Sequence, residues 1–290
     1  MTNLKNSNTF FIIFSLAAFA IFFSPLQDLL RNSFHNELYS HIILIPFISG
    51  YFMYEKRKEL FRDPDFSFVY GIVALLVGIV LFLIGRTKAI GLSPNDYLSL
   101  MTFAALVFWL GGIIFFYGLK AFKTAVFPLL FLFLMVPVPE FIMDRLIYSL
   151  QVCSAEATYA FFKIAGIPLI REGFVFTLPG INIEVAKECS GIRSTLSLFI
   201  IGILSCNLFL RTWRSRGVLL LLLFPLAIFK NGLRIITLSL LGLYVDKTWL
   251  TNSRMHSEGG FIFFLAALTV FGGIIWLLRK WESQTAKRNA

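Results

Sequence analysis

Long apolar runs are the feature that most constrains this chain. A membrane-spanning helix needs about 20 mostly apolar residues, and eight segments come near that length, roughly 8–24, 38–54, 67–85, 97–118, 121–137, 192–210, 217–245 and 261–278. Hydrophobic residues make up 58% of the chain and charged residues 14%, against about 45–50% and about 25% in globular proteins. One soluble core could not bury so much apolar surface. The sequence therefore predicts an all-α polytopic membrane protein, with residues 1–290 as one integral-membrane domain.

Lysine and arginine predict the orientation of these segments. With the N-terminus inside, most basic residues fall on cytoplasmic segments, including the cluster at 56–62 and the C-terminal end at 279–288. An excess of Lys and Arg on short inner loops is the usual determinant of topology. We therefore expect a multi-pass protein of the cytoplasmic (inner) membrane with both termini in the cytoplasm. The net charge of +10 does not indicate nucleic-acid binding, because the basic residues cluster at the ends of apolar runs.

One long segment, 138–191, should lie on the outer side. Its first part mixes apolar and polar residues at helical spacing, which predicts a helix in the outer interface. Its second part has two short β-like runs around Pro179-Gly180, which is typical of a hairpin. The seventh apolar segment would extend about 43 Å at 1.5 Å per residue, so it must tilt, leave the bilayer or break. The stretch KNGLR at 230–234 is a plausible break, because Asn and Gly weaken helices.

The stretch KECSGIRS at 187–194 contains one of only three cysteines, Cys153, Cys189 and Cys206. A free cysteine is most often a small buried apolar residue, and Cys153 and Cys206 are interpreted in that way. Cys189 has a second interpretation, because Ser190 would cap a helix beginning near Ile192 and a helix N-terminus favours a thiolate. Arg193 follows about one turn later. The residues alone leave both interpretations open.

Polar residues near a membrane span are functional candidates. Arg234 lies within the seventh segment with Asn231 on the same face, and it could stabilise an oxyanion or be an arginine at a helix end. His256 precedes the eighth segment, where it could carry a proton for the thiol or be merely solvated. His41 begins the second segment and is interpreted mainly as a structural or substrate-contacting residue.

Together these stretches resemble a known family. ECSGIRS, a downstream NGLR and then MHSEGG, in a frame of eight spans, are similar to the exosortase/archaeosortase family. YSHIILIPFI and FLMVPVPEF also resemble family stretches, so the likeness covers roughly 35–265. Cys-Ser-Gly alone is a weak signal, and the specificity comes from its order and spacing with Asn-x-x-Arg and His.

The resemblance implies a membrane cysteine transpeptidase or protease that acts on secreted proteins. Their C-terminal sorting signal would combine a short motif, an apolar helix and a basic end. By position, Cys189 matches the nucleophile, Arg234 the arginine of the transition state and His256 the general acid and base, while Arg193 matches an accessory position. Ser190, Asn231 and His41 are expected to support this site at the outer face.

Two alternatives remain open. The chain could be a transporter in which Arg234 and His41 line a pathway, although transporters often show internal repeats and we find none. It could also be a membrane acyltransferase that uses the same thiol. We expect no metal and no other cofactor, because the cysteines lack CxxC spacing and no HExxH motif occurs. The expected partners are the substrate tail and the bilayer, and the sequence leaves the oligomeric state open.

Overall fold

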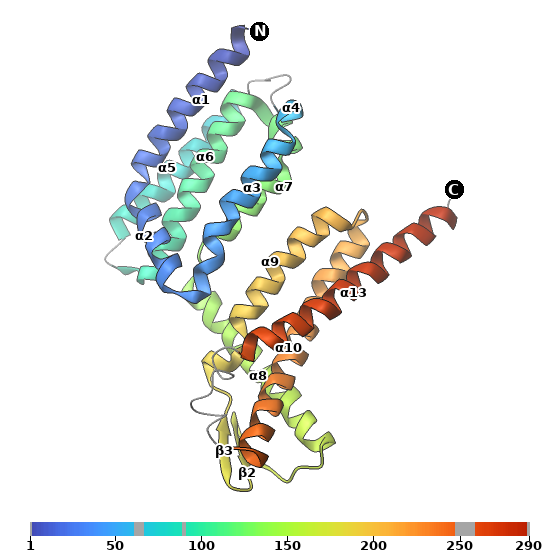
Figure 1. Ribbon diagram of the computed structural model, residues 1–290. Helices are drawn as coiled ribbons and strands as arrows, with labels where there is room; N and C mark the ends of the chain where they lie inside the picture. Colours follow the sequence, from blue (N-terminus) through green and yellow to red (C-terminus); the bar gives the residue numbers. More distant parts are fainter. Residues whose placement is uncertain (1, 61–66, 89–90, 247–258, 289–290) are drawn as a thin grey trace. The chain divides into compact units, whose positions relative to one another are not determined.

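The computed structural model describes residues 2–60, 67–88, 91–246 and 259–288 (Figure 1). The chain folds into two compact units, Met1–Met143 and Asp144–Ala290, and each is described by itself. The first unit contains the helices α1 (Thr2–Ile21), α2 (Phe23–His35), η1 (Glu37–Ile43), α3 (Leu44–Glu55), α4 (Arg57–Leu60), α5 (Phe68–Lys88), α6 (Pro94–Thr124), α7 (Val126–Phe131) and η3 (Leu132–Met135). It also includes the beginning of α8 (Glu140–Ile164).

Glycines bring α5 and α6 into close contact. Gly71, Gly78 and Gly85 recur every seven residues, so they share one face of α5. A Cβ on each would lie 2.7, 2.7 and 2.6 Å from Phe115, Phe108 and Met101 of α6, respectively. The partner numbers fall as the glycine numbers rise, so the two helices are antiparallel. Small residues allow this approach, which is how apolar helices gain packing contacts in a bilayer.

The N-terminus of α6 is tied to the segment that leads into α8. Ser93 caps α6 by accepting a hydrogen bond from the Asp96 N–H. Asn95 donates to the Val138 carbonyl at 2.8 Å and accepts from the Tyr39 hydroxyl at 2.6 Å. The Asp96 carboxylate accepts from the Glu140 N–H at 2.7 Å. These contacts provide hydrogen-bond partners for the Val138 carbonyl and the Glu140 N–H. Both groups lie in a proline-containing segment, where regular helical hydrogen bonds are interrupted.

The second unit combines most of α8 with a small sheet. The strands β1 (Ile170–Glu172), β2 (Val175–Leu178) and β3 (Ile181–Glu184) pair antiparallel in the order β1-β2-β3. Pro179 and Gly180 form the turn between β2 and β3, where Gly180 has φ +89° and suits the third position of a type II turn. The sequence predicted two of these runs, and β1 is an additional strand.

The sheet packs on α8 and α10 (Trp213–Tyr244) through one apolar cluster. Its buried members are Ala155, Phe162, Phe176, Leu178, Val185, Ile235 and Ile236. A Cβ on Gly232 of α10 would lie 2.9 Å from Ala157 of α8, so the two helices approach closely. This packing fixes one face of α10 against α8 just where the KNGLR stretch occurs.

The remaining helices are η4 (Lys187–Ser190), α9 (Ile192–Phe209) and α13 (Gly259–Arg288). A second cluster joins α9, α10 and α13, with Leu198, Cys206, Leu210, Leu219, Leu223 and Phe271 buried. The Glu282 carboxylate of α13 accepts hydrogen bonds from the N–H groups of Arg211 and Thr212 at 3.1 and 2.8 Å. Because these N–H groups precede α10, the contact fixes the turn between α9 and α10.

The described residues contain five helices long and apolar enough to cross a membrane, or up to seven if each of two bent helix pairs counts as one span. The chain is thus an all-α polytopic membrane protein, apart from its small sheet. Segment 38–54 is divided between η1 and α3, and 121–137 contains the short α7 and η3. The prolines in these stretches interrupt the regular helix that apolar composition alone suggests.

Candidate active site

Cys189 lies in a tight turn directly before α9. It belongs to the short η4, and Gly191 follows with φ +78°, a left-handed conformation that favours glycine. The Cys189 side chain is half-buried, and the Cys189 N–H donates to the Ala186 carbonyl at 2.9 Å. The turn therefore presents the thiol at the N-terminal end of a helix, where N–H groups lack intrahelical acceptors.

The structure corrects the expected role of Ser190. Gly191, and not Ser190, precedes the first residue of α9, and no described side chain caps this helix. Ser190 is completely buried, and its hydroxyl has no hydrogen-bond partner among the described residues. The prediction of a serine cap was wrong by one position. The helix begins at Ile192 as expected, but the residue directly before it is Gly191 in a left-handed conformation.

Asn231 of α10 holds the main chain of this turn. Its Nδ2 donates to the Cys189 carbonyl at 2.7 Å and to the Ser154 Oγ of α8 at 2.9 Å. A Cβ on Gly191 would lie 2.9 Å from Asn231 Cγ and Oδ1. The asparagine is 1% exposed, so a glycine is required where its amide packs against the turn. Asn231 thus connects α8, α10 and the segment that carries Cys189.

Lys230, which was not among the predicted site residues, makes a second connection between α10 and this region. Its ammonium donates to the Ser194 Oγ, and the Ser194 hydroxyl donates to the Gly191 carbonyl at 3.0 Å. Lys230 is 6% exposed. A signal was present in the sequence, since a lysine inside the apolar run FPLAIFKNGLRIITL is as unexpected as the arginine four residues later.

Arg234 lies one turn after Lys230 on α10 and is half-buried. It interacts electrostatically with the Cys189 thiol and with Lys230. The helix runs from Trp213 to Tyr244 without a break at 230–234, so of the three options for this long segment, a break at KNGLR does not occur. Packing of Gly232 against α8 keeps the helix regular, because tertiary contacts override weak local propensity. Arg234 therefore lies close enough to Cys189 for an electrostatic interaction, although the helix that carries it is uninterrupted.

The other predicted site residues are placed differently. Arg193 is exposed in the first turn of α9. His41 is half-buried in η1 of the first unit, and His256 lies outside the described residues. Cys206 is buried, with its thiol 3.7 Å from the Arg216 carbonyl. The structure therefore brings Cys189, Asn231 and Arg234 together and adds Lys230, Ser194 and Ser154.

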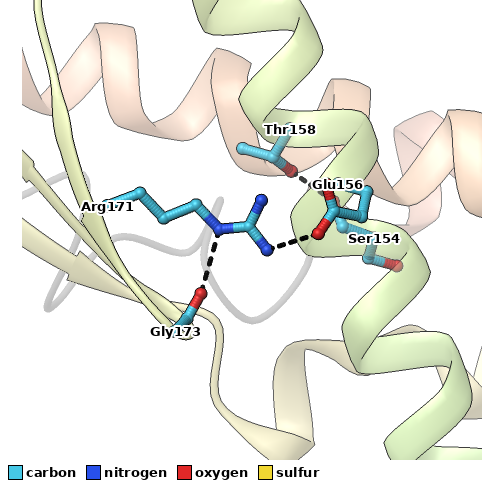
Figure 2. A network of polar contacts seen from close by, with 5 residues as sticks. All are labelled: Ser154, Glu156, Thr158, Arg171 and Gly173. Carbon is cyan, nitrogen blue, oxygen red and sulfur yellow. Dashed lines mark hydrogen bonds and ion pairs between the residues drawn. The ribbon is translucent and has the colours of Figure 1, made fainter.

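A polar network on α8 shares Ser154 with this group of residues (Figure 2). Arg171 of β1 donates to the Glu156 carboxylate at 2.7 Å and to the Gly173 carbonyl at 3.0 Å. The hydrogen bond to Glu156 raises the pKa of Arg171 above its ordinary value. Thr158 donates to the Ser154 carbonyl at 2.7 Å. The network attaches the sheet to the helix that also contributes Ser154.

Comparison with protein families matches residues 31–273 to the family described as Transmembrane exosortase (Exosortase_EpsH). Comparisons with curated proteins and with solved structures return no match. The matched range covers most of the chain and includes both KECSGIRS and KNGLR. With this match and its apolar helices, the chain is a multi-pass membrane protein that belongs to the exosortase family.

Proposed function

We propose that this protein is a cysteine transpeptidase or protease that cleaves the C-terminal sorting signal of secreted proteins, with Cys189 as nucleophile. Membership of the exosortase family supports the class, a membrane transpeptidase or protease acting on sorting signals. The observation that carries the residue assignment is the meeting of two motifs. Asn231 hydrogen-bonds the Cys189 carbonyl, and Arg234 interacts with the Cys189 thiol.

The first step is acylation. The thiolate of Cys189 attacks the scissile carbonyl, and the negative charge of the tetrahedral intermediate develops on the former carbonyl oxygen. Arg234 stabilises that oxygen, because a preorganised cation acts most strongly where water is excluded. When the intermediate collapses, the C–N bond breaks, a thioester forms on Cys189, and the leaving amine takes up the proton that the thiol released. His256 carries that proton in this proposal, as the family resemblance implies.

The second step releases the product. Water or an amine attacks the thioester, the carbon–sulfur bond breaks, and the thiol regains its proton. Hydrolysis gives a free carboxylate, whereas an amine gives a new amide. In our proposal the active site opens to the outer face of the inner membrane, and both termini lie in the cytoplasm. The substrate's tail is apolar, and we propose that it enters sideways from the bilayer. Arg193 is exposed beside the turn and is proposed to contact the substrate.

Cysteine substitution tests the proposal directly. We would co-express the protein with a secreted protein from the same cell that carries a short motif, an apolar helix and a basic end. Cys189→Ala and Cys189→Ser should abolish removal of the tail while the enzyme remains inserted in the membrane. Cys153→Ser provides the matched control, since Cys153 is also a half-buried thiol. Processing at the normal rate by Cys189→Ala would show that another group is the nucleophile.

The acyl-enzyme offers an independent measurement. A covalent adduct between the enzyme and the N-terminal fragment of the substrate should form, and hydroxylamine should release it as expected for a thioester. The adduct should be absent with Cys189→Ala. A transporter predicts no adduct, and its Cys189 should react with thiol reagents no faster than Cys153. An acyltransferase would form an adduct with a lipid-derived acyl group instead, which mass spectrometry distinguishes from a peptide.

A further inference from the structure

Two consecutive residues of α10 hold the two ends of the turn that carries Cys189. Asn231 donates to the Cys189 carbonyl at 2.7 Å. Lys230 donates to Ser194, which in turn donates to the Gly191 carbonyl. The carbonyls of Cys189 and Gly191 are therefore both tied to α10, the first directly and the second through Ser194.

The burial of Lys230 indicates that its contact is specific. Only 6% of the residue is exposed, and burying a charged group is unfavourable unless hydrogen bonds and favourable charges compensate. Arg234, one turn later, adds repulsion between like charges. An apolar residue would pack in this apolar helix without that cost. A lysine buried here against both effects is a functional candidate by the rule for ionisable groups in membrane helices.

The carbonyls matter because each peptide plane carries an N–H on the opposite side. Fixing the Cys189 and Gly191 carbonyls fixes the directions of the N–H groups of Ser190 and Ile192. An oxyanion is stabilised by donors about 2.7–3.1 Å away, held before the reaction begins. Thr195 also donates to the Gly191 carbonyl, through its N–H at 3.0 Å and its hydroxyl at 2.9 Å, so the serine reinforces this anchor and is not its sole support.

We propose that Lys230 is a positioning residue for the reaction at Cys189. It acts through Ser194 on the Gly191 carbonyl, while Asn231 holds the Cys189 carbonyl, and together they keep the turn in the geometry needed for attack and oxyanion binding. The inference rests on the proposed role of Cys189 as nucleophile. Lys230 itself acts without touching the substrate or the thiol.

The test uses the full-length protein in lipid vesicles and a purified tailed substrate. The variants are Ser194→Ala, Lys230→Met and the double variant. Ser197→Ala is the control for the serine, since its hydroxyl donates to the Arg193 carbonyl on the exposed side of α9. Lys280→Met is the control for the lysine, because Lys280 lies over the Trp276 ring at the far end of α13. Rates of acyl-enzyme formation are measured at saturating and at limiting substrate.

Each single variant should lower the maximal rate of acylation by roughly tenfold, because small displacements of reacting groups have effects of that order or larger. The apparent KM should stay unchanged. The double variant should lose no more than the worse single variant, as expected for two residues in one chain of contacts. Lys230→Arg should recover part of the rate, since arginine can also donate to Ser194. Both control variants should react at the wild-type rate.

A charge effect of Lys230 on the thiol makes a different prediction. The rate at which a neutral reagent alkylates Cys189 would be measured against pH. If Lys230 acts through its charge, the midpoint of this pH dependence would shift in Lys230→Met and not in Ser194→Ala. That result overturns the positioning role, as do additive losses or wild-type rates in both single variants. Ser194→Ala removes one oxygen and leaves the lysine in place, so it tests the connection even if Lys230→Met does not fold. Failure of the proposed function itself is distinguishable, because in that case Cys189→Ala would keep full activity.

Discussion

Two close contacts between helices hold opposite lessons about this membrane protein. In the glycine contact, Gly71, Gly78 and Gly85 of α5 meet large side chains of α6. In the polar contact, Asn231 of α10 donates to the turn before α9, and Lys230 of α10 donates to Ser194 in the first turn of α9. The first contact gains dispersion energy from close apolar packing. The second buries polar groups, which is favourable only if their hydrogen bonds are made.

The surroundings of the two helices agree with this difference. In the 18-residue apolar stretch of α5 only 17% of the residues are buried, against 44% in the corresponding stretch of α10. α5 therefore presents most of its surface outward and needs one face for packing. α10 is packed against α8, α9 and α13, so its polar residues are protected from the hydrocarbon. We infer that the glycine contact serves stability and the polar contact serves chemistry, and four substitutions test that division.

The largest effect is expected for Gly191→Ala. An alanine would adopt an unfavourable left-handed φ and its Cβ would lie 2.9 Å from the Asn231 amide. We expect processing to fall at least about 100-fold, because the turn and its hydrogen bond would both shift. The measurement is the acylation rate of protein that remains folded in vesicles.

Gly166→Ala is the matched control for that substitution. Gly166 also has a positive φ, +69°, but a Cβ there would meet no described atom within 4 Å. It should share the backbone cost and keep the activity. If Gly166→Ala lost activity equally, the effect would come from backbone strain in general and not from the contact with Asn231.

The next largest effect is expected for Asn231→Leu. Leucine has a similar size but leaves the Cys189 carbonyl and the Ser154 hydroxyl without their donor. We expect roughly tenfold to 100-fold slower acylation, with a loss of about 1–3 kcal/mol in the free energy of unfolding for the orphaned groups. Acylation kinetics and reversible unfolding in mixed detergent measure the two separately. An active Asn231→Leu enzyme would contradict the functional interpretation of the polar contact.

Gly78→Ala should produce the reverse pattern. Its new Cβ would lie 2.7 Å from the Phe108 Cβ and 2.8 Å from its main chain. We expect the free energy of unfolding to fall by about 1–3 kcal/mol, as for other overpacked positions, while the rate per folded molecule stays unchanged. Gly50→Ala is the control, because a Cβ there would meet nothing described within 4 Å, and alanine favours helices.

The smallest effect is expected for Arg171→Gln, which breaks the ion pair of Figure 2. The side chains of Arg171 and Glu156 are 20% and 60% exposed, and such surface pairs contribute about 0.2–1 kcal/mol. The difference in unfolding free energy from wild type should shrink at high salt, because screening already weakens the pair. A large loss of activity would show that this network takes part in the site.

Sequence patterns predicted the membrane class and indicated Cys189 and Arg234 as candidate site residues, because both predictions depend on local signals. Twenty apolar residues predict a helix in lipid wherever they occur, and an isolated arginine in such a run indicates a site. The same reasoning failed at KNGLR and at Ser190. In each case the outcome depended on packing, with Gly232 against α8 and with the glycine turn before α9.

Lys230, Ser194 and Ser154 illustrate what local patterns miss. Serine is common in membrane helices, and its hydroxyl often donates to its own helix, as Ser197 does. Only the rotation of α10 relative to α8 and α9 decides that Lys230 reaches Ser194 and that Asn231 reaches both Ser154 and Cys189. A rotation of one residue, about 100°, would turn these groups away.

The sequence by itself determined a multi-pass helical protein and the motifs of the exosortase family. Hydrophobicity and residue spacing are properties of the chain, and they act over one helix at a time. The tertiary structure alone decided which polar groups meet. Hydrogen bonds need donors and acceptors within about 3 Å, and residues 231 and 189 reach that distance because α10 packs on α8 through Gly232 and faces the turn that Gly191 permits.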